Sequence, residues 1–160
     1  MTPRVFGVAG WKNSGKTTLV ERLVAEFVRR GWRVATIKHA HHDADVDKPG
    51  TDSFRHRAAG AAEVALVGGR RYAIMHEGPE PTLAEILARL APCDIVLVEG
   101  FKREAHPKIE VRADHDRPLA PSDANVVAIA ADRRPPETQL PWFVRDDVAG
   151  IADFITSRKA

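Results

Sequence analysis

GWKNSGKT at residues 10–17 matches the phosphate-binding Walker A pattern GxxxxGK[ST]. An apolar run, RVFGVA at residues 4–9, precedes it and has the composition of a buried strand. A helical stripe of apolar residues follows it from Lys16 to Arg30 and stops at Gly31. This order of strand, glycine-rich loop and helix is the context that the pattern requires, so the stretch predicts a nucleotide-phosphate site.

The fixed residues of this loop have distinct chemical roles. Gly10 and Gly15 let the backbone curl until successive amides face inward, which forms an anion-binding nest above a helix N-terminus. Lys16 adds a positive charge for the β and γ phosphates, and the hydroxyl of Thr17 is placed to ligate Mg²⁺. The alternative interpretation is a glycine-containing turn that leads into a helix and binds no nucleotide. The residues expected to hold the nucleotide are Gly10, Trp11, Lys12, Asn13, Ser14, Gly15, Lys16 and Thr17.

Strands and helices continue to alternate along the rest of the chain. WRVATIKH at residues 32–39 predicts a second strand, parallel to the first. EVALVGGRRYAIM at residues 63–75 predicts a β-hairpin around Gly68 and Gly69. Further strands are predicted at 94–100, 107–112 and 125–132, and further helices at 51–61, 82–91 and 146–158. We therefore expect a P-loop NTPase-like α/β fold, a three-layer α/β/α arrangement with a mostly parallel central sheet and an inserted β-hairpin.

Length and composition exclude several classes of protein. The 160 residues are enough for one domain, so we expect a single nucleotide-binding domain over residues 1–160. A formal net charge of +2 is too small to predict a nucleic-acid surface, and no apolar run reaches the ~18 residues of a membrane span. The single Cys93 cannot form an internal disulfide, and no signal peptide is evident. The expected location is the cytoplasm.

A second carboxylate near the metal is needed for nucleotide hydrolysis or signalling. DIVLVEG at residues 94–100 is an apolar strand that ends in Glu99, at the edge of the sheet where ligands bind. Asp94 lies at the opposite end of the same strand. We therefore expect Glu99 to lie near Mg²⁺ or its waters, and the alternative is a solvated acid at a strand end.

The stretch KHAHHDADVDKPGTD at residues 38–52 is dense in side chains that ligate metals. A calcium loop counted from Asp43 fails, because Lys48 stands where glycine is needed and Phe54 where the last acid is needed. A structural zinc site would need a second ligand pair. The stretch follows the second strand, so we expect a switch or docking loop near Mg²⁺ and the γ-phosphate. An independent transition-metal site and a merely solvated loop are the alternatives.

Within this loop, the second strand extended past Lys38 would place alternate residues along one side. The residues on that side would be His39, His41, Asp43, Asp45 and Asp47, with His42 on the other. Asp43 or Asp47 would then be a ligand of the metal or of its water. Arg55 and Arg57 follow in SFRHR and would meet phosphate or an acidic partner, or remain ordinary surface arginines.

Three stretches together carry a family resemblance: GWKNSGKT, IKHAHHDADVDKPGTDSFRHRAAGA at residues 37–61 and DIVLVEGFKREAHPKIEV at residues 94–111. With them the chain resembles the MobB family of molybdopterin-guanine dinucleotide biosynthesis adaptor proteins, over residues 4–112. The resemblance implies a homodimeric GTP-binding adaptor with weak Mg²⁺-dependent GTPase activity. It also implies the guanylyltransferase MobA as the partner, and molybdopterin as a further one. The protein would then be a slow GTP hydrolase that acts mainly as an adaptor.

The same resemblance assigns residues. The family's phosphate loop corresponds to Gly10–Thr18, which adds Thr18 to the nucleotide site, and its acidic loop to His39–Asp52. Lys16, Glu99 and Asp43 would act in hydrolysis. The guanine-reading pattern [NT]KxD is absent, and AIAADRR at residues 128–134 offers Asp132 as the acceptor for the guanine N1 and N2 donors. Thr51 and Ala44 differ from the lysine and the larger apolar residue expected in relatives.

Two other functions use the same loop. A small-molecule kinase would need a positioned base, for which Asp43 is available, and a lid with arginines, for which RHR at residues 55–57 is available. No lid segment is evident in the sequence. A metal-delivery P-loop chaperone would bind its ion through histidines, but here three histidines stand among three aspartates rather than in a long tract.

Overall fold

The computed structural model describes residues 2–40 and 45–158. The chain divides into two compact units, one formed by Met1–His39 with Leu87–Ala160 and the other by Ala40–Ile86. The first unit contains the GWKNSGKT loop, and the second contains the hairpin. The expectation of one nucleotide-binding domain for the whole chain stays a prediction.

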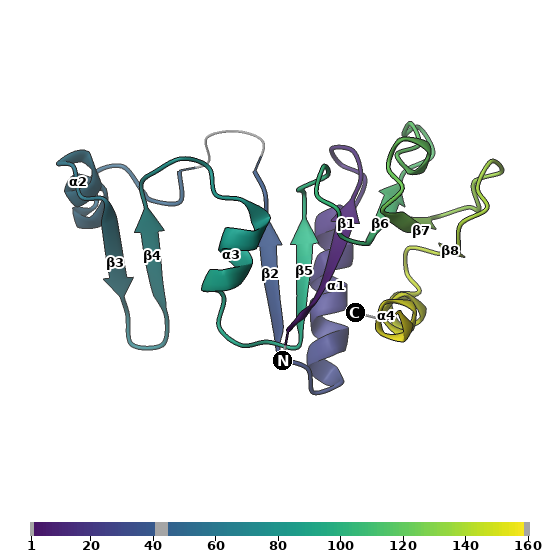
Figure 1. The fold of residues 1–160 in the computed structure, drawn as a ribbon, viewed down its shortest axis with the longest axis horizontal. Helices are drawn as coiled ribbons and strands as arrows, with labels where there is room; N and C mark the ends of the chain where they lie inside the picture. The colour runs from purple at the N-terminus through teal and green to yellow at the C-terminus, as the bar shows by residue number, and fades with distance from the viewer. Residues whose placement is uncertain (1, 41–44, 159–160) are drawn as a thin grey trace. The chain divides into compact units, whose positions relative to one another are not determined.

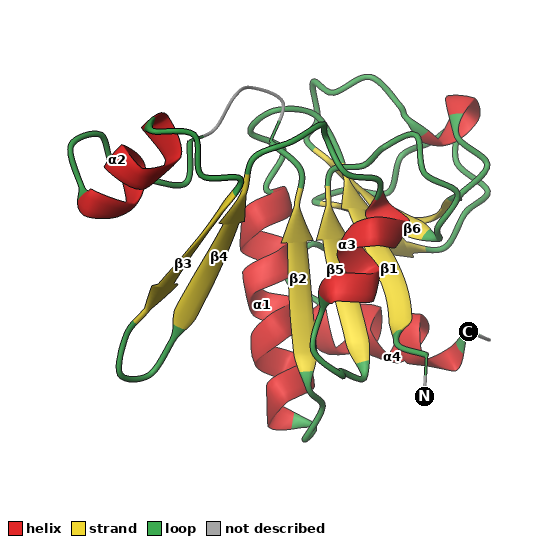
Figure 2. Ribbon diagram, turned by 60° about the vertical axis from the view of Figure 1, so that its left-hand side comes forward, coloured by secondary structure: helices red, strands yellow, loops and turns green. Residues whose placement is uncertain are grey.

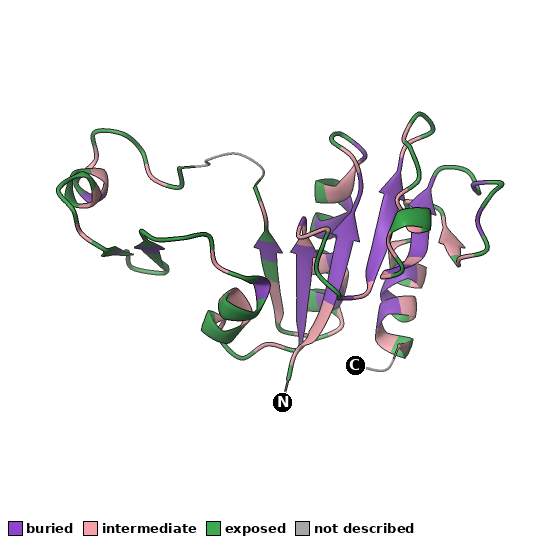
Figure 3. Cartoon of the chain, turned by 45° about the horizontal axis from the view of Figure 1, so that its top comes forward, coloured by how far each residue is buried: buried purple, intermediate pink, exposed green. Residues whose placement is uncertain are grey.

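A six-stranded sheet forms the centre of the first unit, and every strand pair in it is parallel (Figure 1). Its order is β2-β5-β1-β6-β7-β8. The strands are β1 (Arg4–Ala9), β2 (Val34–Lys38), β5 (Ile95–Glu99), β6 (Lys108–Arg112), β7 (Val126–Ala131) and β8 (Trp142–Phe143). The central strands β1 and β5 are almost wholly buried (Figure 3), which explains why they are continuous apolar runs. The predicted P-loop-like α/β fold with a mostly parallel central sheet is confirmed.

Two helices share one hydrophobic core with this sheet (Figure 2). Helix α1 (Lys16–Arg29) begins directly after the glycine-rich loop and ends before Gly31, which has a positive φ of 84°. Helix α4 (Val148–Ser157) packs against α1. The buried helical side chains are Leu19, Val20, Leu23, Phe27, Ile151, Ala152 and Ile155.

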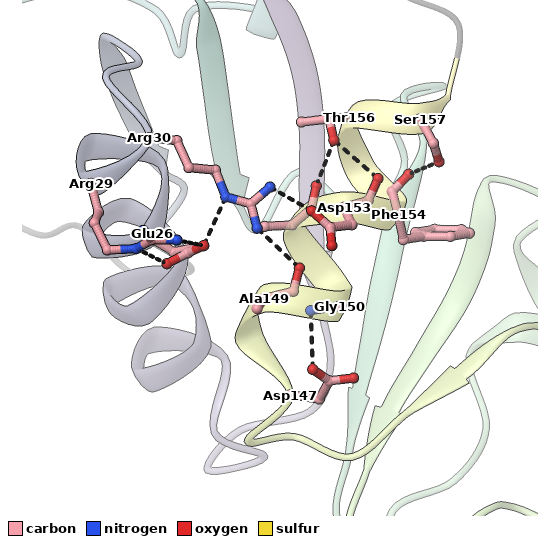
Figure 4. Close-up of polar contacts among 11 residues, drawn as sticks. Glu26, Arg29, Arg30, Asp147, Ala149, Gly150, Asp153, Phe154, Thr156 and Ser157 are labelled. Atoms are coloured by element: carbon pink, nitrogen blue, oxygen red, sulfur yellow. Dashed lines mark hydrogen bonds and ion pairs between the residues drawn. The ribbon is translucent and has the colours of Figure 1, made fainter.

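Polar contacts hold α4 in its place (Figure 4). Arg30, just after α1, donates from Nη1 to Asp153 Oδ1 at 2.6 Å and from Nη2 to the Ala149 carbonyl at 3.2 Å. Asp147 caps α4, because its Oδ1 accepts from the Gly150 amide at 3.0 Å. One arginine and one capping carboxylate therefore fix the position and the beginning of the last helix.

The cap of α4 gives a first prediction. Asp147→Ala is expected to lower the free energy of unfolding by about 1 kcal/mol, because the Gly150 amide loses its acceptor. Urea unfolding followed by circular dichroism measures the change. The control is Asp146→Ala, which removes a neighbouring carboxylate that is 81% exposed and pairs with Arg22; its expected cost is about 0.5 kcal/mol or less. Equal costs for the two variants would contradict the capping role.

Strand β6 carries charged side chains on one buried side. Lys108, Glu110 and Arg112 alternate along it, with exposed fractions of 0%, 1% and 7%. The Glu110 carboxylate accepts hydrogen bonds from Arg112 Nε and Nη2 at 2.8 and 2.9 Å. It also accepts from the backbone amides of Leu119 and Ala120 at 2.9 and 3.0 Å. Lys108 Nζ lies 2.9 Å from Asp123 Oδ2, and Arg112 also contacts Glu137. Each buried charge is thus compensated by a segment outside the strand.

The second unit contains α2 (Asp52–Ala58) and the hairpin of β3 (Glu63–Val67) and β4 (Tyr72–His76). Val64 and Met75 face each other across the hairpin and are buried. The hairpin is confirmed, although its connection spans residues 68–71 rather than the two glycines alone. Helix α3 (Leu83–Arg89) crosses the boundary between the units.

Among residues 2–40 and 45–158, no helix combines the length and the apolar composition needed to cross a membrane.

Candidate functional site

The loop at residues 10–17 connects the carboxyl end of β1 to the first turn of α1. A Cβ at Gly10 would lie 2.4 Å from the Val111 carbonyl and 2.5 Å from Ser14 Oγ, so only glycine fits there. Gly15 has a positive φ of 97°, and Asn13 one of 63°. The local requirement for glycine that the sequence predicted is therefore present in the backbone. Lys12, Asn13, Thr17 and Thr18 are exposed, and Ser14 is buried.

Lys16 turns back over its own loop. Its ammonium group donates to the carbonyl of Trp11. Burial lowers the pKa of Lys16, Glu99 acts in the opposite direction, and the positive charges of Lys102 and Lys38 lower it further. Lys16 therefore has neighbours of both signs: Lys102 and Lys38 repel its ammonium group, whereas Glu99 and Asp116 attract it.

The side chains of Thr17 and Glu99 are in contact, and their predicted role as ligands of Mg²⁺ stays a prediction. Thr17 Oγ1 donates to Glu99 Oε1 at 3.0 Å, because β5 pairs with β1 and the carboxyl ends of both strands lie at the same edge. Lys38 Nζ lies 3.8 Å from the same carboxylate. Asp94 lies at the opposite end of β5, where its Oδ2 accepts from the Arg33 amide at 2.6 Å. A hydroxyl and a carboxylate in contact are hard oxygen donors, which is the donor set that fits Mg²⁺.

A tight turn follows Glu99. Gly100 has a φ of 98°, and a Cβ there would lie 2.7 Å from His39 Cβ. Phe101 has a φ of 45°, and its ring stacks on His39 with centroids 4.5 Å apart. The His39 amide donates to the Glu99 carbonyl at 2.8 Å. His39 is therefore packed at the end of β2, beside the turn that presents Glu99.

Two cations from distant parts of the chain lie against the ring of Trp11, within the loop. Lys102 Nζ is 4.8 Å and Arg117 Cζ 5.4 Å from its ring centroid. The indole Nε1 donates to the Arg117 carbonyl at 2.7 Å. Sequence reasoning missed both cations. The signal for Lys102 was its place three residues after Glu99, whereas nothing in the sequence marked Arg117.

Asp132 is engaged by an arginine that the sequence did not indicate. Arg145 Nε donates to Asp132 Oδ1 at 2.7 Å, and Arg145 Nη2 contacts the other oxygen. Arg145 lowers the pKa of Asp132, and its Nη1 donates to the Ser14 carbonyl at 3.2 Å. Asp132 is thus connected through Arg145 to the loop at residues 10–17. Its role as a guanine acceptor stays a prediction.

Asp45 and Asp47 belong to the second unit, where they bind Arg57. Arg57 Nη2 donates to Asp45 Oδ2 at 2.9 Å, and Arg57 Nε lies 3.6 Å from Asp47 Oδ2. Asp47 Oδ1 also accepts from the hydroxyls of Thr51 and Ser53 at 3.2 and 2.9 Å. These contacts hold together the residues that precede α2 and its first turn. Thr51 caps the helix, because its hydroxyl accepts from the Phe54 amide at 3.3 Å. Arg57 is therefore engaged in ion pairs within the second unit and is not a free arginine on the surface.

The predicted extension of β2 to Asp47 is wrong. The strand ends at Lys38, and the chain bends at residues 46 and 47. The physical reason is that aspartates bond to nearby amides, here Asp47 N to Asp45 Oδ1 at 2.9 Å, which competes with a strand. The predicted ligands His41, His42 and Asp43 lie outside the described residues. Arg55 is exposed and lies 3.9 Å from Asp52.

Comparisons with known proteins agree on one family. The sequence model of molybdopterin guanine dinucleotide synthesis protein B, MobB, matches residues 5–132. A molybdopterin-guanine dinucleotide biosynthesis adapter protein of Haemophilus influenzae is 42% identical over 155 residues, which cover 94% of this chain and 86% of that protein. One of Escherichia coli is 40% identical over 159 residues, with coverage of 94% and 90%. The crystal structure of a MobB protein homolog from Bacillus stearothermophilus has a TM-score of 0.73 and 31% identity, and the match covers 97% of this chain and 99% of that one. The chain therefore belongs to the MobB family.

Proposed function

We propose that this protein is an adaptor in the biosynthesis of molybdopterin guanine dinucleotide, and that it binds GTP with Mg²⁺ and hydrolyses it slowly. The observation that carries the nucleotide site is the contact of Thr17 with Glu99 at 3.0 Å beside the Gly10–Thr17 loop. The adapter role is supported by the names of the relatives from Haemophilus influenzae and Escherichia coli.

The proposed chemistry assigns each group of the site one task. The loop amides and the ammonium of Lys16 would bind the phosphates, after Lys16 leaves the Trp11 carbonyl. Thr17 and Glu99 would hold Mg²⁺, which supplies neutralising charge to the phosphate oxygens when it is bound. Glu99 is 12% exposed at its side chain, so its charge is little screened by water.

Guanine preference is proposed through Asp132. A carboxylate with two acceptor oxygens suits the N1 and N2 donors of guanine. Arg145 occupies both oxygens, so the base would bind after Arg145 shifts toward the loop carbonyl that it already contacts at Ser14. The comparison of GTP with ATP affinity is the direct test of this proposal.

The proposed partners are a second copy of the chain, the guanylyltransferase MobA and molybdopterin. The hairpin supports a homodimer, because it exposes large apolar side chains that a second copy would cover. These side chains are Leu66, Val67, Tyr72 and Ile74, with exposed fractions of 57%, 76%, 73% and 61%. Sedimentation velocity of the purified chain measures the oligomeric state.

A nucleotide titration tests the proposal. Calorimetry with GTP, ATP and GDP, each with and without Mg²⁺, is expected to show Mg²⁺-dependent binding that is tightest for GTP. Phosphate release is then followed with and without MobA, molybdopterin and small-molecule acceptors. Slow release without a phosphorylated acceptor supports the adaptor. Failure of every nucleotide to bind, or rapid phosphorylation of an acceptor, overturns it.

A further inference from the structure

We propose that Lys102 is a second cation of the nucleotide site, which contacts the terminal phosphate of a nucleoside triphosphate. In this proposal Trp11 is the surface on which the Lys102 ammonium rests while no triphosphate is bound. The inference rests on the proposed nucleotide site and deepens it, because it assigns the group that distinguishes a triphosphate from a diphosphate.

The position of Lys102 carries the argument. Its Nζ lies 4.8 Å from the ring centroid of Trp11, which is itself the second residue of the phosphate loop. The ammonium therefore lies over a side chain of the same loop that is proposed to bind the phosphates. Lys102 is also close enough to Lys16 to repel it, alongside Lys38, while Glu99 and Asp116 act with the opposite sign. A terminal phosphate entering between Lys16 and Lys102 would satisfy both cations.

The backbone at Lys102 is held in place by the buried ammonium group of Lys108. Lys108, which is wholly buried, donates from Nζ to the Lys102 carbonyl at 2.9 Å and to the Glu104 carbonyl at 2.8 Å. Its third bond is the contact with Asp123. A surface loop needs no such anchor, and an anchored backbone reduces the ordering that binding must supply.

The preceding turn fixes the direction from which Lys102 approaches. Gly100 passes close to His39, and Phe101 stacks on the same imidazole. Because Glu99 contacts Thr17, the turn begins at the proposed Mg²⁺ site and ends with Lys102 over Trp11. The carboxylate for the metal and the cation for the phosphate thus come from one short segment.

The contact with Trp11 suits a resting position. A cation–π contact is weaker than a charge-assisted hydrogen bond to phosphate, so a bound triphosphate would draw the ammonium away from the indole. The emission of Trp11 would then report the binding of a triphosphate. A diphosphate would leave Lys102 on the ring, because it lacks the phosphate that Lys102 contacts.

Lys102→Gln tests the assignment through affinity. We expect it to weaken binding of Mg²⁺-GTP by about tenfold to a hundredfold and binding of GDP by less than about threefold. Lys102→Arg keeps the charge and is expected to recover most of the loss. The matched control is Arg103→Gln, which removes the same charge from the next, exposed residue and is expected to change both affinities by less than about twofold.

Fluorescence separates this role from a structural one. Wild-type protein is expected to change its tryptophan emission with GTP but not with GDP. The change should disappear in Trp11→Phe, which leaves Trp32 and Trp142 as background, and in Lys102→Gln at saturating GTP. Unchanged GTP affinity in Lys102→Gln, or equal losses for GTP and GDP, would overturn the inference while the proposed function stands. A wild-type protein that binds no nucleotide would overturn both.

Discussion

Lys16→Ala is expected to weaken the binding of Mg²⁺-GTP by at least about a hundredfold, because it would remove the proposed charge-assisted contact with the β and γ phosphates. The loop amides remain in the variant, so the loss measures the ammonium group itself. Lys16 is half-buried at the start of α1, and its contact with the Trp11 carbonyl is local. The fold should therefore survive the change, and calorimetry measures the affinity.

Lys12→Ala is the matched control for this loss. Lys12 belongs to the same loop and carries the same charge, but its side chain is exposed. Its removal is expected to weaken binding by about threefold or less, because exposed charges are screened by salt. An affinity of Lys16→Ala equal to that of wild type would refute the whole assignment of a nucleotide site.

The free energy of unfolding is expected to fall by about 3 kcal/mol as the pH decreases from about 6.5 to about 4, through His106 alone. This side chain is 7% exposed, and its ring nitrogens have no hydrogen-bond partner within the described chain. Burial lowers the pKa of His106 to about 4, and the charge of Lys108 contributes while Asp123 opposes it. The folded state therefore keeps the imidazole neutral where the unfolded chain binds a proton. Stability is complete above the unfolded pKa and is lost as the pH falls toward the folded one.

Urea unfolding of His106→Gln and wild type at about pH 7.5 and about pH 4.5 isolates this contribution. Protonation of carboxylates also lowers the free energy of unfolding in acid, but this effect is equal in both proteins. The difference in unfolding free energy between wild type and His106→Gln should therefore shrink or reverse at the lower pH. His115→Gln, with a histidine side chain that is 83% exposed, should keep the wild-type dependence. A parallel pH dependence of His106→Gln and wild type would show that His106 is not buried neutral.

The elements that the sequence predicted well are those defined by local pattern. The order of β1, loop and α1 follows from the spacing of apolar residues and the positions of the glycines within a short stretch. The structure has β1 and α1 in this order. Strand β8 was missed because it has two residues and exists through its pairing with Ile129 and Ala130 in β7. The 3₁₀ turn at Ala120–Ser122 was missed because a proline-containing stretch reads as loop.

The same distinction applies to the candidate site. The meeting of Thr17 with Glu99 was predictable, because parallel strands bring their carboxyl ends to one edge. The contacts of Lys102 and Arg145 with the loop join residues far apart in sequence, and no local spacing encodes them. Asp45 and Asp47 were assigned to an extended strand because periodicity ignores the bonds that short carboxylates make with nearby amides.

The charged side of β6 limits how the loop after this strand can be exchanged. Glu110 receives the amides of Leu119 and Ala120, so the loop that follows β6 is matched to an acid inside the sheet. A homologue's loop grafted in its place would leave the buried carboxylate of Glu110 without two of its donors unless the grafted backbone presented amides at the same positions. Chimeras of this chain should therefore exchange strand and loop as one cassette, with crossover points placed before Lys108 and after Asp123.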